Sequence, residues 1–420
     1  MDLDLPYGAG TVPVRLPAGA AVEVVLPGAP PPPAVGEAAL VAAALDAPLG
    51  AEPLEIAARG AARVTVVVPD RTRDAGAARW LPEVLARLAR AGVPEGGLRV
   101  LVGGGIHATT TPADRAAIVG EEVARRVRVE ATSPDDATAY APLGEDAAVR
   151  PLRVHRAALE CDLLVLAGGV APHYLAGFSG GPKALVPGCA DRETVAAAHR
   201  LTLDATVAPD GSVRSWLGRV EGNPFRAALL RVAHKHPRAF LVNVGLSDGR
   251  VLHAAAGEVG AAHDSACADH RALFASRAPE PADLVIAGGG APADRDLLQA
   301  HKALVVAAAC AKPSAPIVWL AHAADGPGHD AFLPWFEAGR LERHLAALRR
   351  AFHPYGLTAY ALRWKAARHP IHVVSTVSRD VLRPMGLLPY PSAQAAVDAA
   401  WAAARPARVV VLPRAARTFF

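Results

Sequence analysis

The most informative segment of this sequence is residues 168–200, GGVAPHYLAGFSGGPKALVPGCADRETVAAAHR. It contains His173, a glycine-rich turn that carries Lys183, and His199. It follows an apolar run at 163–166, which predicts a buried parallel strand. Open α/β sheets bind their ligands outside the carboxyl ends of such strands. The glycines match neither GxGxxG nor a P-loop, because no Ser or Thr follows Lys183, so the lysine must have another use.

Three further clusters of polar side chains follow predicted strands. They are Asp70, Arg71, Thr72 and Arg73 after the run at 64–68, His107 after three glycines and the run at 99–102, and Gln299 with Lys302 after the glycines at 288–290. Each residue alone has an ordinary structural interpretation, such as a helix cap, a hydrogen-bonded loop histidine or a lysine that reaches the surface. These interpretations do not explain why so many cations and histidines gather after strands.

These residue types suit a small hydroxy-carboxylic acid. Arg73 and Lys302 can bind a carboxylate, and an arginine can do so with two parallel hydrogen bonds. Gln299 lies three residues before Lys302, so the two share one helix face. Two of the histidines could exchange a proton with a hydroxyl, because imidazole titrates near a pKa of ~6.5. A third histidine, if neutral, could bind a metal.

The pattern of elements predicts an α/β protein with two domains of mainly parallel sheets flanked by helices. Strand-like runs lie at 64–68, 99–102, 163–166, 240–244, 284–286, 317–320, 372–377 and 409–412, and helical patterns lie between them, as at 77–91 and 341–352. Two strands look alike, CDLLVLAGG and ADLVIAGGG, which indicates two sheets that each offer a glycine-rich turn. We therefore expect the active site in an interdomain cleft.

The stretch Arg-Ala-Pro-Glu-Pro at 277–281 is the best candidate for a domain boundary. We expect an N-terminal cofactor-binding domain at 1–277 and a C-terminal domain at 278–420. The last strand and tail could return to the first domain.

The composition favours a cytoplasmic globular protein. The net charge of +4 over 420 residues comes without a basic block, which argues against nucleic-acid binding. The four cysteines show no CxxC spacing, as expected of reduced thiols. The first residues lack a signal sequence, and the apolar run at 303–311 is too short to span a membrane.

Taken together, these motifs resemble the nickel-dependent lactate racemase family, whose members racemise or epimerise 2-hydroxy acids. The resemblance rests on LPYG at 5–8, DRTR at 70–73, GGGIH at 103–107, HYLAGFSGGPK at 173–183, VPG at 186–188, His199 and QAHK at 299–302. It spans nearly the whole chain, and the segment from His173 to Lys183 with its downstream Pro-Gly and histidine is the most specific part.

The resemblance implies a nickel-pincer cofactor, a pyridinium-type mononucleotide that carries thioamide and thiocarboxylate sulfur donors. It assigns covalent attachment to Lys183, nickel ligation to His199 and proton transfer to His107 and His173. It assigns further cofactor contacts to Asp70, Arg71, Thr72, Arg73, Ser179, Gly180 and Gly181, and substrate contacts to Arg73, Gln299 and Lys302. The partners that it implies are a small 2-hydroxy acid and separate cofactor-maturation proteins. An oligomer is compatible with the sequence.

Two positions depart from the family pattern. Ala108 stands where many members have an arginine, and Leu298 where lactate-type members often have an aromatic residue. Both changes alter the wall or charge of the pocket, so the sequence does not fix the side chain of the substrate. The substrate is expected to be lactate or a related 2-hydroxy acid.

Two other functions are compatible with the residues. In the first, His107, His173 and His199 bind zinc and activate water for hydrolysis. In the second, the protein carries the nickel cofactor without turnover, which needs Lys183 and His199 but not both of the other histidines.

Overall fold

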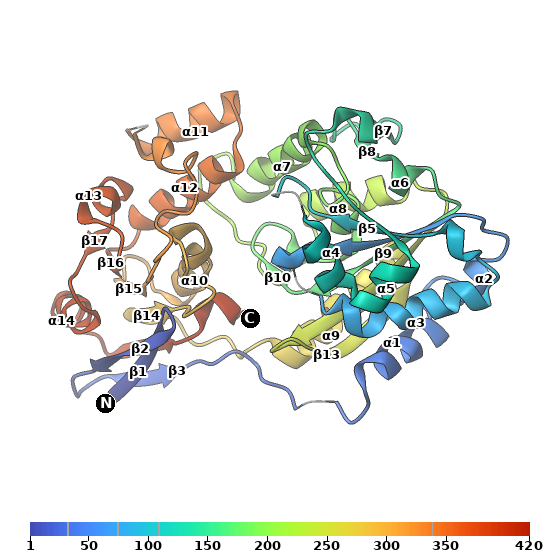
Figure 1. The fold of residues 1–420 in the computed structure, drawn as a ribbon. Coiled ribbons are helices and arrows are strands. Elements are labelled where there is room, and N and C mark those ends of the chain that lie inside the picture. The colour runs from blue at the N-terminus through green and yellow to red at the C-terminus, as the bar shows by residue number, and fades with distance from the viewer. Residues whose placement is uncertain (32, 74, 108–109, 338) are drawn as a thin grey trace. The chain divides into compact units, whose positions relative to one another are not determined.

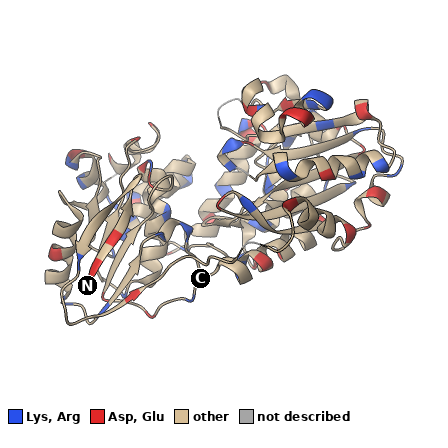
Figure 2. Cartoon of the chain, turned by 60° about the horizontal axis from the view of Figure 1, so that its bottom comes forward, with Lys and Arg blue, Asp and Glu red and all other residues tan. Residues whose placement is uncertain are grey.

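The computed structural model describes residues 1–31, 33–73, 75–107, 110–337 and 339–420, which form two compact units (Figure 1). The central unit comprises Ala29–Ala205 and Trp216–Leu273. The terminal unit comprises Met1–Gly28, Thr206–Ser215 and Phe274–Phe420. In the described residues, no helix is long and apolar enough to cross a membrane. Figure 2 shows acidic and basic residues interspersed on the helices of both units.

The central unit is built on a six-stranded sheet with the order β13-β12-β9-β4-β5-β6. All neighbours are parallel except β12 and β13, which form an antiparallel pair. The strands are β4 (Val64–Pro69), β5 (Leu98–Gly103), β6 (Arg128–Ala131), β9 (Leu163–Val170), β12 (Ala239–Ser247) and β13 (Arg250–Gly257). Small hairpins accompany them, namely β7 (Tyr140–Pro142) with β8 (Arg153–His155), and β10 (Pro172–His173) with β11 (Gly177–Phe178).

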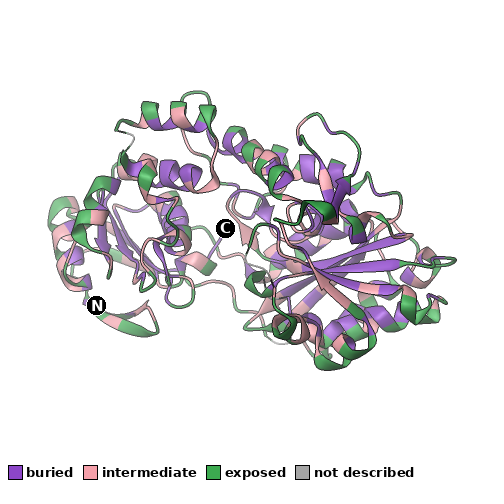
Figure 3. Ribbon diagram, turned by 45° about the horizontal axis from the view of Figure 1, so that its top comes forward, coloured by how far each residue is buried: buried purple, intermediate pink, exposed green. Residues whose placement is uncertain are grey.

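Helices cover both faces of this sheet, so its central strands are buried (Figure 3). Successive residues of β4 face opposite sides: Val66 packs with the first group of helices, whereas Val67 packs with the second. The first group is α1 (Glu37–Asp46), α2 (Leu54–Ala57), α3 (Ala77–Arg90), α4 (Pro112–Val119) and α5 (Glu121–Arg126). The second is α6 (Arg156–Leu159), α7 (Arg192–Thr206), α8 (Pro224–Ala233) and α9 (Val259–Phe274). Burial on both faces explains why the strands read as unbroken apolar runs.

The chain changes direction in this sheet at β4. From β4 it adds β5 and then β6 on one side, and later β9 pairs with the other side of β4. Connections leave the carboxyl ends of β4 and β9 in opposite directions, which opens a crevice there. The polar clusters that follow β4, β5 and β9 therefore lie at one edge of the sheet.

The terminal unit holds a second six-stranded sheet, entirely parallel, with the order β17-β16-β15-β14-β18-β3. Its strands are β3 (Ala21–Val24), β14 (Leu284–Gly288), β15 (Ile317–Leu320), β16 (Ile371–Val374), β17 (Leu388–Pro389) and β18 (Arg408–Leu412). Its helices are α10 (Leu297–Cys310), α11 (Leu341–Arg350), α12 (Pro354–Ala366), α13 (Arg379–Leu382) and α14 (Ala393–Ala404). The hairpin of β1 (Asp2–Tyr7) and β2 (Gly10–Arg15) joins α14 in one core of this unit.

The expected α/β class with mainly parallel sheets is confirmed, and the two look-alike strands, β9 and β14, belong to different sheets. The strand expected at 372–377 ends at Val374, because the next residues turn and Thr376 donates its hydroxyl hydrogen bond to the carbonyl of His322. Residues 1–28, expected within the range 1–277, group with the terminal unit. The last strand, β18, lies between β14 and β3 in the same unit.

A buried lysine lies in the core of the terminal unit. Lys365 of α12 is 5% exposed, and its Nζ donates to the carbonyl of Ala361 at 3.1 Å and contacts Nε2 of His301 at 3.2 Å. Burial lowers the pKa of Lys365 to about 7. Burial also lowers the pKa of His301 well below its ordinary value, and the nearby lysine lowers it further. Burial therefore disfavours the charged form of both groups.

We predict that Lys365→Met stabilises the protein at pH 7 by on the order of 1–3 kcal/mol. The unfolded lysine keeps its proton up to a pKa of ~10.4. Between pH 7 and that value the unfolded chain binds more protons than the folded one, so wild-type stability rises with pH. The advantage of the variant should shrink over the same range, as measured by urea unfolding at pH 7 and pH 9.5. Lys312→Met, at a half-exposed lysine paired with Asp283, is the control; equal pH slopes for Lys365→Met and wild type would contradict the prediction.

Candidate active site

A pocket of about 140 Å³ lies at the carboxyl edge of the central sheet, where the chain reverses direction around β4. The last residues of β4, β5 and β9, the residues that follow these strands, and one residue of α7 form its walls. The lining includes Asp70, Arg73, Gly103, Gly104, Gly105, His107, Gly168, Gly169, His173, Ser179, Gly180, Lys183, Pro187, Gly188 and His199. All of them belong to the central unit.

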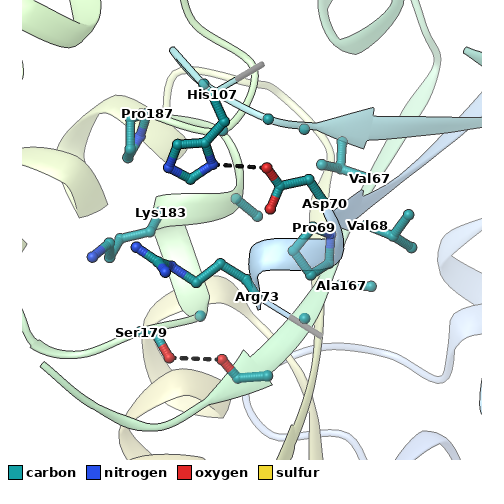
Figure 4. Close-up of a pocket in the computed structure, with 18 of the residues that line it drawn as sticks. Val67, Val68, Pro69, Asp70, Arg73, His107, Ala167, Ser179, Lys183 and Pro187 are labelled. Atoms are coloured by element: carbon teal, nitrogen blue, oxygen red, sulfur yellow. Dashed lines mark hydrogen bonds and ion pairs between the residues drawn. The ribbon is translucent and has the colours of Figure 1, made fainter. Parts of the chain in front are cut away.

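The loop that carries Lys183 is tied back to the end of β9 through Ser179. The Ser179 hydroxyl donates to the carbonyl of Gly169 at 2.9 Å (Figure 4). It also accepts from the N–H of Ala171 at 2.9 Å. Gly180, with φ of 76°, then turns the chain into a short 3₁₀ helix, Gly181–Ala184. A side chain at Gly180 would be strained in this left-handed conformation and would press on the carbonyl of Gly169. The glycines thus bring the lysine close to the strand end.

Asp70 and His107 form a hydrogen-bonded pair beyond the carboxyl ends of β4 and β5 (Figure 4). His107 Nδ1 lies 2.7 Å from Asp70 Oδ2. The other carboxylate oxygen accepts from the hydroxyl of Thr72 at 2.7 Å and from its N–H at 3.1 Å. Because both carboxylate oxygens are acceptors, His107 donates from Nδ1, and its Nε2 carries a lone pair in the neutral ring. The same orientation serves general bases that accept protons at Nε2.

The carboxyl group of Asp70 is ionised in this setting. Its side chain is 5% exposed, and burial alone would raise its pKa. The hydrogen bonds from His107 and Thr72, with the charge of a protonated His107, outweigh burial and hold the pKa of Asp70 below its ordinary value. An anion fixed at Nδ1 stabilises His107 after it has taken a proton.

His173 is held in the opposite way. Its Nδ1 accepts the backbone N–H groups of Leu175 and Ala176, each at 3.2 Å, and its ring stacks on Tyr174. In the neutral ring the proton therefore lies on Nε2. A second proton on Nδ1 would face two N–H donors, so these contacts stabilise the neutral form. His173 must release them before it can accept a proton.

His199 combines features expected of a metal ligand. It lies on α7, and its Nδ1 donates to the carbonyl of Val195 at 2.8 Å, which leaves Nε2 with a lone pair. Burial lowers the pKa of His199 to about 4, and the charges of Lys183 and His107 lower it further against the effect of that hydrogen bond. The imidazole is neutral at pH 7, and neutral imidazole nitrogen is the form that binds metals.

The charge of the pocket favours an anion. Figure 4 shows the side chains of Arg73, Lys183 and His107 directed into the same space. Among the described lining residues Asp70 is the sole carboxylate, and its oxygens are engaged by His107 and Thr72. An arginine and a lysine that line one pocket attract a carboxylate or a phosphate.

The structure brings together eight of the predicted site residues, namely Asp70, Arg73, His107, His173, Ser179, Gly180, Lys183 and His199. Thr72 donates a hydrogen bond to Asp70, and Arg71 forms an ion pair with Asp114. Gly181 faces the ring of His263 and does not line the pocket. Gln299 and Lys302 lie on α10 of the terminal unit, where Lys302 Nζ donates to Gln299 Oε1 at 2.8 Å.

Of the two departures from the family pattern, one falls within the described part of the chain. Leu298 lies next to Gln299 on α10, and a side chain at Gly328 would press against it. Ala108 lies outside the described residues. The pairing of Asp70 with His107 was not predicted. The signal available was an acid directly after one strand and a histidine after its neighbour.

Comparison with known proteins places the chain in one family. Residues 7–209 match the family model of the lactate racemase N-terminal domain, and residues 278–416 match that of the lactate racemase C-terminal domain. The chain belongs to the lactate racemase family. The expected enzyme class, an isomerase of the racemase type, is thereby confirmed.

Named relatives extend along most of the chain. A lactate racemase from Thermoanaerobacterium thermosaccharolyticum is 28% identical over 308 residues, which cover 73% of this chain and 70% of the relative. A lactate racemase from Lactiplantibacillus plantarum is 28% identical over 299 residues, which cover 71% of this chain and 69% of the relative.

Two solved structures share the fold of this lactate racemase family member. The lactate racemase apoprotein from T. thermosaccharolyticum superposes with a TM-score of 0.89 at 24% identity, covering 100% of this chain and 99% of that one. A protein from Thermotoga maritima superposes with a TM-score of 0.60 at 19% identity, covering 78% of this chain and 87% of that one.

We predict that His199 stays neutral, with its proton on Nδ1, from pH 7.5 down to pH 5.5. A folded-state pKa of about 4 places its titration below this window. An exposed histidine, with a pKa of ~6.5, titrates within it. Long-range ¹H–¹⁵N correlation spectra of the apoprotein report the tautomer directly, and His199→Gln assigns the signal. A proton on Nε2, or a shift that titrates in this window, would be inconsistent with a preformed metal ligand.

Proposed function

We propose that this chain racemises a 2-hydroxy carboxylic acid, with a nickel-pincer nucleotide attached to Lys183 and with His107 and His173 as proton donor and acceptor. The observation that carries the proposal is the convergence of four groups on one pocket. A lysine, a histidine with an available Nε2 and two further histidines of opposite hydrogen-bond polarity all line it.

The pocket residues fit such a cofactor by their donor chemistry. The bond from Nδ1 of His199 to the carbonyl of Val195 leaves Nε2 as the ligand atom, and Lys183 lines the same pocket. Several lining residues at the strand ends are glycines, such as Gly104, and the absence of a Cβ would let a flat ring approach the backbone. Arg73 and Lys183 suit the anionic groups of a nucleotide or substrate.

The chemistry that needs such a cofactor is the inversion of a very weak carbon acid. The C–H beside a carboxylate resists removal as a proton, because the carbanion would lie next to an existing negative charge. When bound, the cofactor would instead accept a hydride from C2 and later return it. Loss of the hydride and of the hydroxyl proton leaves a planar 2-keto acid, and return to the opposite face inverts the centre.

The residues of the chain then handle binding and protons. Arg73 would hold the carboxylate, with Gln299 and Lys302 as further substrate-binding residues. His107 would take the hydroxyl proton at Nε2, because Asp70 orients the ring and stabilises the imidazolium. His173 would serve the opposite face. One histidine enters the cycle neutral and the other protonated, and each turnover exchanges these states.

Lactate is the substrate of the named relatives, and we propose lactate or a related 2-hydroxy acid for this chain. The zinc hydrolase has less support, since a catalytic zinc site needs three protein ligands in one cluster. Within the described residues no group of three or more His, Cys, Asp or Glu side chains is arranged to hold a metal ion. A carrier without turnover needs no general base, so that hypothesis does not account for the Asp70–His107 pair.

We predict that protein co-expressed with cofactor-maturation proteins carries a sulfur-rich mononucleotide adduct on Lys183 and nickel in near-equal amount. Lys183→Ala should lose both, because the attachment atom is gone. Peptide mass spectrometry measures the adduct, metal analysis measures the nickel, and chiral chromatography of lactate measures the racemisation, all on one sample. Unmodified Lys183 in a preparation where a named relative loads normally would refute the proposal.

We predict that Asp70→Asn lowers kcat by roughly 10²–10⁴-fold while the Lys183 adduct is retained. Thr72 offers two donors to one side of residue 70, so the amide oxygen must face Thr72 and the NH₂ must face His107. His107 Nδ1 then becomes an acceptor, and the proton moves to Nε2, where the base is needed. Chiral chromatography gives the rate and peptide mass spectrometry the adduct. A fully loaded variant with wild-type kcat would exclude His107 as the base.

A further inference from the structure

The 3₁₀ helix that carries Lys183 is capped from a distant strand. Its first N–H, that of Gly181, donates to Oδ1 of Asn243 at 2.9 Å. The residue before it, Gly180, has no side chain that could act as a cap. Asn243 lies in β12, 62 positions along the chain, and is completely buried. A helix start is normally capped by its own preceding residue, so a long-range cap is unusual.

The other end of the Asn243 amide holds the neighbouring strand. Its Nδ2 donates to the carbonyl of Gly168 in β9 at 3.0 Å and to that of Val242 at 3.2 Å. The side chain therefore meets an N–H on one side and two carbonyls on the other. Only an amide presents an acceptor and a donor in this way, and a carboxylate of the same shape does not.

A second support comes from α9 beneath the same loop. His263 is 1% exposed, and its Nε2 donates to the carbonyl of Ser179 at 3.1 Å. Its ring occupies the place of a side chain at Gly181, since a Cβ there would lie 2.5 Å from the ring. Burial lowers the pKa of His263 to about 4, the charge of Arg226 lowers it further, and the ring stays neutral at pH 7.

We propose that Asn243 and His263 are positioning residues that brace the loop carrying Lys183 in the conformation needed for cofactor attachment. The functional part rests on the proposed function, in which Lys183 is the attachment point. The loop contains two consecutive glycines at positive φ, and such backbone loses more conformational entropy on ordering than any other. Two buried hydrogen bonds, from Asn243 of β12 to the N–H of Gly181 and from His263 of α9 to the carbonyl of Ser179, offset that loss.

The brace itself is tested on the apoprotein, without any cofactor. Asn243→Asp keeps the shape but turns an oxygen toward the carbonyls of Gly168 and Val242. His263→Phe keeps a ring over Gly181 but removes the donor to Ser179. Thr65→Val is the matched control. Thr65 lies in β4 of the same sheet, outside the pocket lining, and its hydroxyl donates a buried hydrogen bond to the carbonyl of Ala157 in α6.

Hydrogen–deuterium exchange of the peptide that spans Gly181–Ala184 should be about tenfold faster in both brace variants. The same peptide should exchange at the wild-type rate in Thr65→Val, with β4 and β12 protected in all folded proteins. If Asn243→Asp fails to fold, His263→Phe decides alone. Wild-type exchange of the loop in a folded brace variant overturns the brace.

The occupancy of the Lys183 adduct distinguishes a failure of the brace from a failure of the proposed function. With maturation proteins present, wild type and Thr65→Val should carry the Lys183 adduct at equal occupancy, and the brace variants at less than about a third of it. Full occupancy in variants whose loop exchanges fast overturns the positioning role. An unloaded wild type contradicts the proposed function, and the exchange rates of the loop then decide by themselves whether Asn243 and His263 brace it.

Discussion

The site depends on the parallel pairing of β4 with β5 on one side and with β9 on the other. This pairing aligns the carboxyl ends of three strands, so the residues that follow each strand meet at one edge. Asp70 follows β4, His107 follows β5, and the lysine loop follows β9. A shift of β9 by one residue would turn its apolar side chains to the wrong helix layer, so core packing keeps the register of the site.

Hydrogen-bond polarity then gives three histidines of one pocket three different characters. A carboxylate at Nδ1 makes His107 a base that tolerates positive charge. Two backbone N–H groups place the proton of neutral His173 on Nε2. A backbone carbonyl and burial give His199 an available lone pair without a competing proton. The imidazole is the same each time, and the neighbouring backbone or side chain decides its use.

Much of this arrangement could be predicted because it is local in sequence. Strands buried on both faces read as apolar runs, and polar residues directly after them mark the pocket edge. The hydrogen-bond partners could not be predicted, since the spacing of His107 and His173 says nothing about which ring nitrogen is engaged. Asn243 interrupts the apolar run at 240–244, a signal of a buried polar contact, but its partners lie on another strand and loop. The grouping of residues 1–28 with the terminal unit rests on the packing of the β1–β2 hairpin against α14 and on β3, a four-residue strand with partly exposed side chains and a weak pattern.

The position of β3 has a consequence for the order in which the protein is made. β3 forms its parallel ladder with β18, from the far end of the chain, whereas every strand of the central sheet comes from residues 64–257. During synthesis the central unit can therefore complete its sheet before β18, the partner strand of β3, has been made. The terminal sheet can close only after β18 has left the ribosome, so the pocket-bearing unit can fold before the terminal unit is complete.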